Sequence, residues 1–179
     1  QGTHTQGGAY TTVGMVFKHA LSWINFKVRT DNGVGDADPK IAINSITLNN
    51  VPVNGTLTVT NNNFATTENT CTTVNLDANW NNTVTANMKL VETGIVTDSF
   101  ADDLLLTGAY KEFGGNGVLV IPSNQTSFTI NYTITQPDGT PNTFNYTYNL
   151  AGDWTMAKKY VYNITMTLSE ILIEPTVTP

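Results

Sequence analysis

Two neighbouring stretches of strict apolar/polar alternation constrain the fold more than any other feature of this sequence. The apolar positions are Phe128, Ile130, Tyr132 and Ile134 in the first stretch, and Phe144, Tyr146, Tyr148 and Leu150 in the second. A repeat of two residues is typical of a strand with one buried face. Between the stretches lies the turn sequence Pro137-Asp138-Gly139. The pattern therefore predicts a β-hairpin.

The composition extends this prediction to the whole chain. Among 179 residues there are 31 Thr and 22 Asn, whereas charged residues make up only 12%. Thr is β-branched and favours strands, and Asn favours turns. A charged helical bundle or a coiled coil is excluded, because both need many more charged side chains.

Further alternating stretches, some of which join into one strand across a bulge or a phase shift, bring the total to roughly eight strands. They are residues 13–21, 24–28, 41–48, 51–60, 72–76, 83–91, 118–122, 160–168 and 171–173. We predict an all-β fold, a two-sheet antiparallel β-sandwich of Greek-key or transthyretin-like type with little helix. We interpret residues 1–12 as a flexible lead-in or inter-domain linker, and residues 13–179 as the sandwich domain.

Several local signals predict interruptions of the strands. A change of alternation phase predicts a bulge or short turn near Ser22-Trp23, and Asn54-Gly55 is expected to separate two short runs. The glycine-rich stretch 114–117 is expected to break the chain before residue 118. Within residues 98–110, Ala101, Leu104 and Leu105 lie at spacings that suit a short helical turn.

Charge and hydropathy exclude two classes of partner. The net charge of −6 and the pI near 4.6 argue against nucleic-acid binding, which usually requires a basic surface. No apolar run approaches the roughly 20 residues that span a bilayer. The single cysteine, Cys71, cannot form an internal disulfide, and we expect a small, buried structural role for it.

The sequence offers poor material for catalysis. Of the two histidines, His4 lies in the lead-in, and His19 is expected on the apolar face of a strand as a structural residue. No nucleophile, zinc, nucleotide or phosphate motif is present. We expect no enzyme activity, no cofactor and no metal. Calcium at two Asp-rich loops stays open as an alternative; the residues are Asp31, Asp36 and Asp38, and Asp98, Asp102 and Asp103.

Carbohydrate binding is an alternative function, because exposed tryptophans stack on sugar rings. The candidates are Trp23, Trp80 and Trp154. Trp80 stands among Asn79, Asn81 and Asn82, which suggests a partly exposed ring with amides beside it. A secreted carbohydrate-binding module would present Trp80 and a second aromatic as a flat platform.

Three stretches, in this order, resemble the fimbrillin-like (Mfa-like) surface proteins of Bacteroidetes-type bacteria, in their C-terminal half. The first runs from Phe17 through His19 and Leu21 to Val28. The second contains Leu119-Val120-Ile121-Pro122, followed by Phe128. The third contains Trp154, Ala157, Lys158, Tyr160 and Tyr162. Ala157 stands where the family usually has Gly, and Ser123 where it often has Gln.

This resemblance implies a β-sandwich subunit, exported as a lipoprotein precursor to the outer membrane and cell surface. It implies assembly into fimbriae by strand exchange, or display as an adhesin. The expected partners are other fimbrial subunits or the protein's own N-terminal domain, and a host glycan or protein. The eight motif residues are expected to be structural: Phe17, His19, Leu21, Pro122, Trp154, Lys158, Tyr160 and Tyr162. We also expect an accessible sheet edge at residues 171–178, where Pro175 limits pairing.

Overall fold

The computed structural model describes residues 19–33, 35, 37–61, 76–91, 94–95, 104–124 and 127–179. All regular structure within these ranges is β-strand. The strands are β1 (Ser22–Thr30), β2 (Lys40–Asn61), β3 (Leu76–Val91), β4 (Gly94–Ile95), β5 (Leu104–Leu105), β6 (Lys111–Val120), β7 (Ser127–Thr135), β8 (Pro141–Asn149), β9 (Lys159–Met166) and β10 (Ile171–Thr178).

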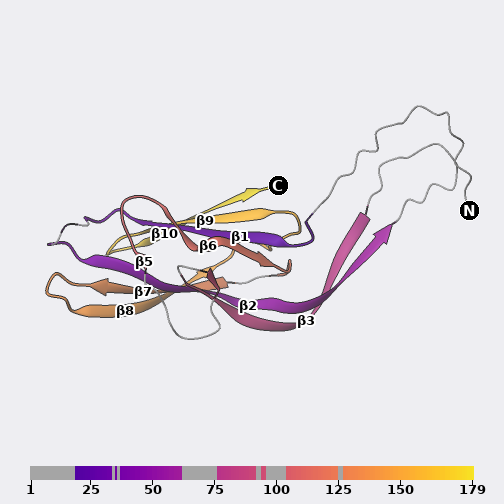
Figure 1. Ribbon diagram of the computed structural model, residues 1–179, viewed down its shortest axis with the longest axis horizontal. Coiled ribbons are helices and arrows are strands. Elements are labelled where there is room, and N and C mark those ends of the chain that lie inside the picture. Colours follow the sequence, from indigo (N-terminus) through magenta and orange to yellow (C-terminus); the bar gives the residue numbers. More distant parts are fainter. Residues whose placement is uncertain are drawn as a thin grey trace, which may run out of the picture.

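The strands form two stacked sheets, and the predicted all-β sandwich is therefore confirmed (Figure 1). One sheet has the order β10-β9-β1-β6, and the other has the order β4-β3-β2-β7-β8, with β5 also paired to β2. Nearly all pairs are antiparallel, but β1 and β9 run parallel. The paired ends of β2 and β3 continue beyond the sandwich as a two-stranded ribbon.

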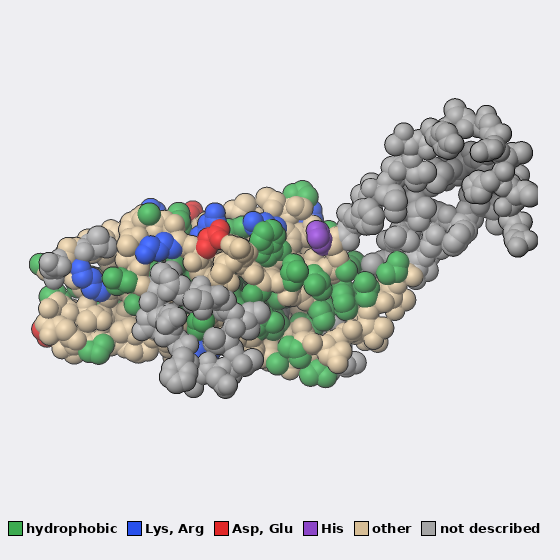
Figure 2. Space-filling model, viewed as in Figure 1, with side chains coloured by type: hydrophobic (Ala, Val, Ile, Leu, Met, Phe, Trp, Pro, Cys, Tyr) green, Lys and Arg blue, Asp and Glu red, His purple; other side chains and the backbone are tan. Residues whose placement is uncertain are grey.

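A single apolar core fills the space between the sheets. Ile24, Phe26 and Val28 of β1 are fully buried, as the alternation predicts. Phe26 contacts the ring of Phe128 edge-on at 5.0 Å between ring centroids and stacks on Tyr162 at 5.5 Å. Uncharged polar groups dominate the surface in Figure 2, where charged side chains are sparse.

The separate runs expected at residues 41–48 and 51–60 belong to one strand. β2 continues through Asn54-Gly55, so the expected separation there is wrong. Irregular pairing with β3 between Leu48 and Val51, and again around Asn54, takes up the change of phase. Asn50 adopts a positive φ of 55° at the first of these bulges. Asparagine tolerates this conformation better than most residues, which lets the strand continue.

The glycine-rich stretch is also inside a strand. β6 includes residues 114–117, which bulge out opposite Asn25 between the pairs Ile24–Val118 and Phe26–Phe113. The irregularity within β1 thus lies at residues 24–26. The chain also bends at residues 20–21, directly before β1 begins at Ser22, close to the expected bulge or short turn. Gly117 has a φ of 93°, and a Cβ there would lie 2.6 Å from the Ile24 carbonyl oxygen, so only glycine fits.

The helical turn expected in residues 98–110 is absent from its described part, 104–110. Leu104 and Leu105 pair with β2 instead, and the backbone N–H of Leu106 donates to the Ile41 carbonyl at 2.8 Å. The Leu106 side chain is buried, and its burial against the sheet favours an extended segment paired with β2 over a helical turn. Residues 98–103 lie outside the described ranges, as do 1–18 and Cys71.

Candidate functional site

The three sequence motifs meet in space. Parallel pairing of β1 with β9 places Phe26 opposite Tyr162. An isolated β-bridge joins Ser123, next to Pro122, to Trp154. Phe128 contacts Tyr162 edge-on at 5.1 Å between centroids. The motifs therefore build one region of the core.

The motif residues differ in burial. Trp154, Tyr160 and Tyr162 are buried, and burial raises the pKa of Tyr162 to about 12. Leu21, Pro122 and Lys158 are half-buried. The Leu21 carbonyl accepts a hydrogen bond from the Ala157 N–H at 3.2 Å, and the Lys158 carbonyl accepts one from Trp23 N–H at 2.9 Å.

His19 is exposed and precedes β1, so the expectation that it lies on an apolar strand face is wrong. Strand pairing with β9 begins at Trp23, because the main chain before it contacts the 155–158 connection instead. Phe17 lies outside the described residues. The remaining motif residues keep the expected structural character as a prediction.

An open side of the sandwich is the principal feature that could serve function. On one side, β6 packs beside β4 and β3 of the other sheet. On the opposite side, the sheets end in β8 and β10, each of which has one strand partner among the described residues. β8 faces β9 there, because Tyr148 contacts Tyr162 edge-on at 6.3 Å.

Inward-facing side chains of β8 are exposed along this open side. Tyr146 stands opposite the buried Ile130, and Phe144 stands opposite Tyr132 and stacks on it. Paired residues of an antiparallel sheet share a face, so both rings point towards the interior layer. Yet Phe144 is 44% exposed and Tyr146 is 36% exposed. Their inner faces therefore lack a complete cover.

β10 shows the same incomplete cover along its second half. Pro175 and Val177 stand opposite the buried Tyr162 and Tyr160, which places them on the inner face. Ile171 and Ile173 pack against the core, but Pro175 is exposed and Val177 is 52% exposed. Among the described strands β10 is an edge strand, as expected for residues 171–178. Alternation predicted these faces, but it carried no signal for their exposure.

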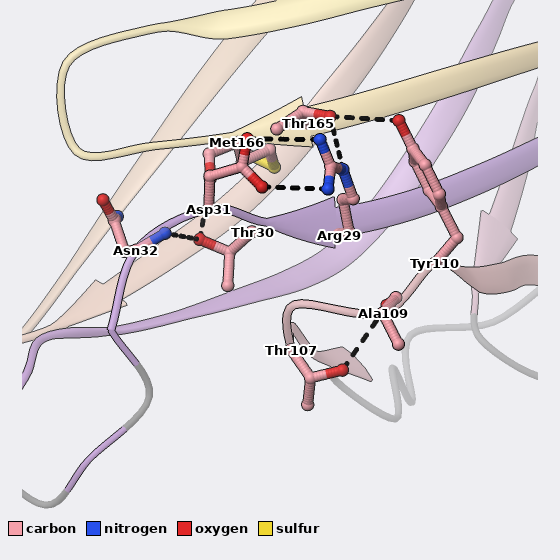
Figure 3. Close-up of polar contacts among 9 residues, drawn as sticks. All are labelled: Arg29, Thr30, Asp31, Asn32, Thr107, Ala109, Tyr110, Thr165 and Met166. Carbon is pink, nitrogen blue, oxygen red and sulfur yellow. Dashed lines mark hydrogen bonds and ion pairs between the residues drawn. The ribbon is translucent and has the colours of Figure 1, made fainter.

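A polar cluster on the outside of the first sheet is centred on Arg29 (Figure 3). The Arg29 guanidinium forms two contacts with the Asp31 carboxylate, at 3.0 and 3.2 Å, and lies 4.9 Å from the Tyr110 ring centroid. Its Nε donates to Thr165 Oγ1 at 3.0 Å. The charges of Arg29 and Asp31 are paired with each other. Through its contacts with Arg29 of β1 and Thr165 of β9, Tyr110 holds the segment before β6 against these two strands.

The alternative sites predicted from sequence are only partly described. Asp31 pairs with Arg29, and the Asp38 carboxylate accepts a hydrogen bond from Gly35 N–H at 2.9 Å. Asp36 and the second Asp cluster lie outside the described ranges. In the described part, no group of three or more His, Cys, Asp or Glu could hold a metal ion. The predicted absence of an enzyme activity stays a prediction.

Trp80 is half-buried, and its indole N–H donates to the Ala20 carbonyl at 2.8 Å. Trp154 lines one surface groove together with Trp80 but is buried, so these two rings do not form a flat exposed platform. No helix within the described ranges is long and apolar enough to cross a membrane.

The comparison with protein families agrees with these motifs. The family model described as fimbrillin-like matches residues 2–179. The chain belongs to the fimbrillin-like family. The resemblance seen in the three motifs is thereby confirmed, while no curated protein matches this fimbrillin-like chain.

Solved structures similar to this fimbrillin-like chain come from Bacteroides. A fimbrial protein from Bacteroides vulgatus is 16% identical over 89% of this chain and 54% of its own, with a TM-score of 0.46. A protein provisionally assigned to cell adhesion, from Bacteroides uniformis, is 17% identical over 91% of this chain and 51% of its own, with a TM-score of 0.38. The chain thus spans about half the length of these structures.

Proposed function

We propose that this chain is a structural subunit of a cell-surface fimbria, joined to its neighbours by strand exchange. Membership of the fimbrillin-like family supports the proposal. The proposal includes export as a lipoprotein precursor to the outer membrane, and residues 13–179 as one sandwich domain beside an N-terminal domain. Strands of both sheets contribute to a single core cluster, which supports the one-domain division.

The observation that carries the proposal is the open side between β8 and β10. An extended segment inserted there would extend a β ladder with its backbone and cover Phe144, Tyr146 and Val177 with alternate apolar side chains. Such an addition buries apolar surface and satisfies edge backbone groups at the same time. Other fimbrial subunits are the proposed donors.

β8 is the better acceptor edge of the two. Pro175 removes a backbone donor from the middle of β10, whereas the only proline of β8 is its first residue, Pro141. Residues 142–149 therefore offer an uninterrupted run of backbone groups. We propose that the donor segment pairs with β8 and packs its apolar face against Tyr146.

Size-exclusion chromatography with light scattering on the full-length processed protein tests this assembly. We expect oligomers for the wild-type protein and monomers for Tyr146→Lys, because a lysine on the inner face would bury an unpaired charge. Thr147→Lys is the matched control, since Thr147 lies on the outer face of the same strand, opposite Thr129.

A monomeric wild-type protein under all processing conditions contradicts the polymerising role. In that case a non-polymerising surface adhesin, with the open side covered by the protein's own N-terminal domain, becomes the better interpretation. Equal loss of oligomers in both lysine variants would also contradict a donor seated on the inner face of β8.

A further inference from the structure

A second surface feature lies away from the open side, where the β2–β3 ribbon leaves the sandwich. It is a groove of about 510 Å³ between β3 and the connections that precede β7 and β9. This volume lies within the usual range of small-ligand sites, about 300–1,000 Å³. Its apolar lining consists of Trp80, Trp154, Pro122 and Met156, and Figure 2 shows hydrophobic side chains gathered near the base of the ribbon.

Hydrogen bonds hold the walls of the groove in place. The Trp80 indole N–H is fixed on the Ala20 carbonyl, and the bridge between Ser123 and Trp154 joins two of the walls. The backbone N–H of Thr155 donates to the Tyr160 hydroxyl at 2.9 Å. A site whose walls are fixed before binding loses little conformational entropy when a ligand arrives.

The polar groups at the groove are free to meet a ligand. Asn79, Asn124 and Asp153 line the groove and are exposed. No other described residue engages the side chains of these three. Each asparagine amide offers two donors and an acceptor, and the carboxylate accepts up to four hydrogen bonds.

This combination narrows the class of ligand. Among the described lining residues Asp153 alone carries a charge, which disfavours anions and is too little to hold a divalent cation. Five of the nine lining residues that the structure describes are polar, which suits a lipid poorly. A saccharide has an apolar C–H face for the Trp80 ring, whose π-face carries negative charge density, and hydroxyls that can donate and accept.

We propose that this groove binds a neutral saccharide, with a sugar face against Trp80 and hydroxyls on Asn124 and Asp153. The contact is a binding site of the folded domain by itself. It does not depend on the assembly proposed for the open side.

Titration of the purified chain with methyl glycosides of galactose, glucose, mannose, fucose and N-acetylglucosamine, followed by NMR of the indole N–H signals, tests the proposal. We expect at least one glycoside to shift the Trp80 signal at millimolar concentration. Trp80→Ala should weaken binding about tenfold or more. Trp23→Ala is the control and should change the affinity less than about twofold. Trp23 lies outside the groove, and its indole N–H donates a hydrogen bond to the Asn116 carbonyl, as that of Trp80 does to Ala20.

A second pair of variants keeps the test decisive if Trp80→Ala does not fold. Asn124→Ala should weaken binding about three- to tenfold, and Asn142→Ala, at an exposed position of β8, should not. Lactose should bind at least as well as sialyllactose, because Asp153 and the negative net charge repel a carboxylate. Binding of none of the glycosides, equal losses in the paired variants, or a preference for sialyllactose would overturn the proposal.

Discussion

Trp154 donates its indole N–H to the hydroxyl oxygen of Tyr162 across 2.8 Å in the core of the sandwich. Both residues are buried, and they belong to one sequence motif. Tyr162 also packs its ring against Phe26, Phe128 and Tyr148. One tyrosine therefore joins both sheets through its ring and fixes the connection before β9 through its hydroxyl.

Tyr162→Phe should destabilise the protein by about 1–3 kcal/mol, because it leaves the buried Trp154 N–H without an acceptor while keeping the ring. Urea denaturation measures the free energy of unfolding. Tyr146→Phe is the control, since its ring is 36% exposed, and it should change stability by less than about 0.5 kcal/mol. Equal effects of the two variants would show that the buried bond contributes nothing.

Stability should fall at alkaline pH through the same residue. Burial raises the folded-state pKa of Tyr162 to about 12, from an ordinary value of 10.0. Between these pH values the unfolded chain loses the phenol proton and the folded chain keeps it. Deprotonation therefore stabilises the unfolded state relative to the folded state. The contribution of the Tyr162 phenol to the free energy of unfolding is fully present below pH 10, and it declines by roughly 2 kcal/mol towards pH 12. Unfolding curves of Tyr162→Phe should lack this part of the decline.

Ala157→Gly should stabilise the protein by about 0.5–1 kcal/mol. Ala157 has a φ of 57°, in the left-handed region where a Cβ is strained and glycine is not. This conformation explains why the resembling motif usually has glycine here. Thermal unfolding should show a higher midpoint, and a lower midpoint would mean that the Ala157 methyl group makes contacts that outweigh its strain.

Three glycines separate backbone strain from steric overlap. Gly117→Ala combines a φ of 93° with a Cβ 2.6 Å from the Ile24 carbonyl oxygen, so it should cost more than about 2 kcal/mol. Gly139→Ala has a φ of 86° in open space and should cost about 1 kcal/mol. Gly152→Ala meets no atom within 4 Å and should be nearly neutral. Chemical denaturation of the three variants should reproduce this order.

Truncation of two phenylalanines in the β7–β8 hairpin measures how open the sandwich is. Phe128→Ala should cost about 3–5 kcal/mol, because Phe128 is fully buried. Phe144→Ala should cost less than about 1.5 kcal/mol in the isolated chain, because Phe144 is 44% exposed. If the two variants lose similar stability, the inner face of β8 is covered in solution.

The sequence predicted the local elements well where a period of two ran without interruption. The β7–β8 hairpin follows from alternation and a turn, both of which are properties of nearby residues. The predictions that were wrong at Asn54-Gly55 and at residues 114–117 share a cause. Glycine and asparagine permit a turn, but they equally permit a bulge, and burial against another strand decides between them.

The candidate sites were less accessible to sequence reasoning. The motif around Trp154 and Tyr162 was visible as a pattern, and the fimbrillin-like family was identified from it. The groove beside Trp80 was only half visible, because its walls come from three separate segments of the chain.

The amino-acid sequence by itself determined that the chain forms strands, which faces are apolar, and which family it belongs to. Only the tertiary structure decided that β1 runs parallel to β9. It also decided that the inner faces of the edge strands β8 and β10 are incompletely covered by the opposite sheet. The alternation of Phe144 and Tyr146 is the same as that of Phe128 and Ile130, yet one pair is exposed and the other buried. Exposure depends on whether a strand of the opposite sheet lies above a residue, and that strand is distant in sequence.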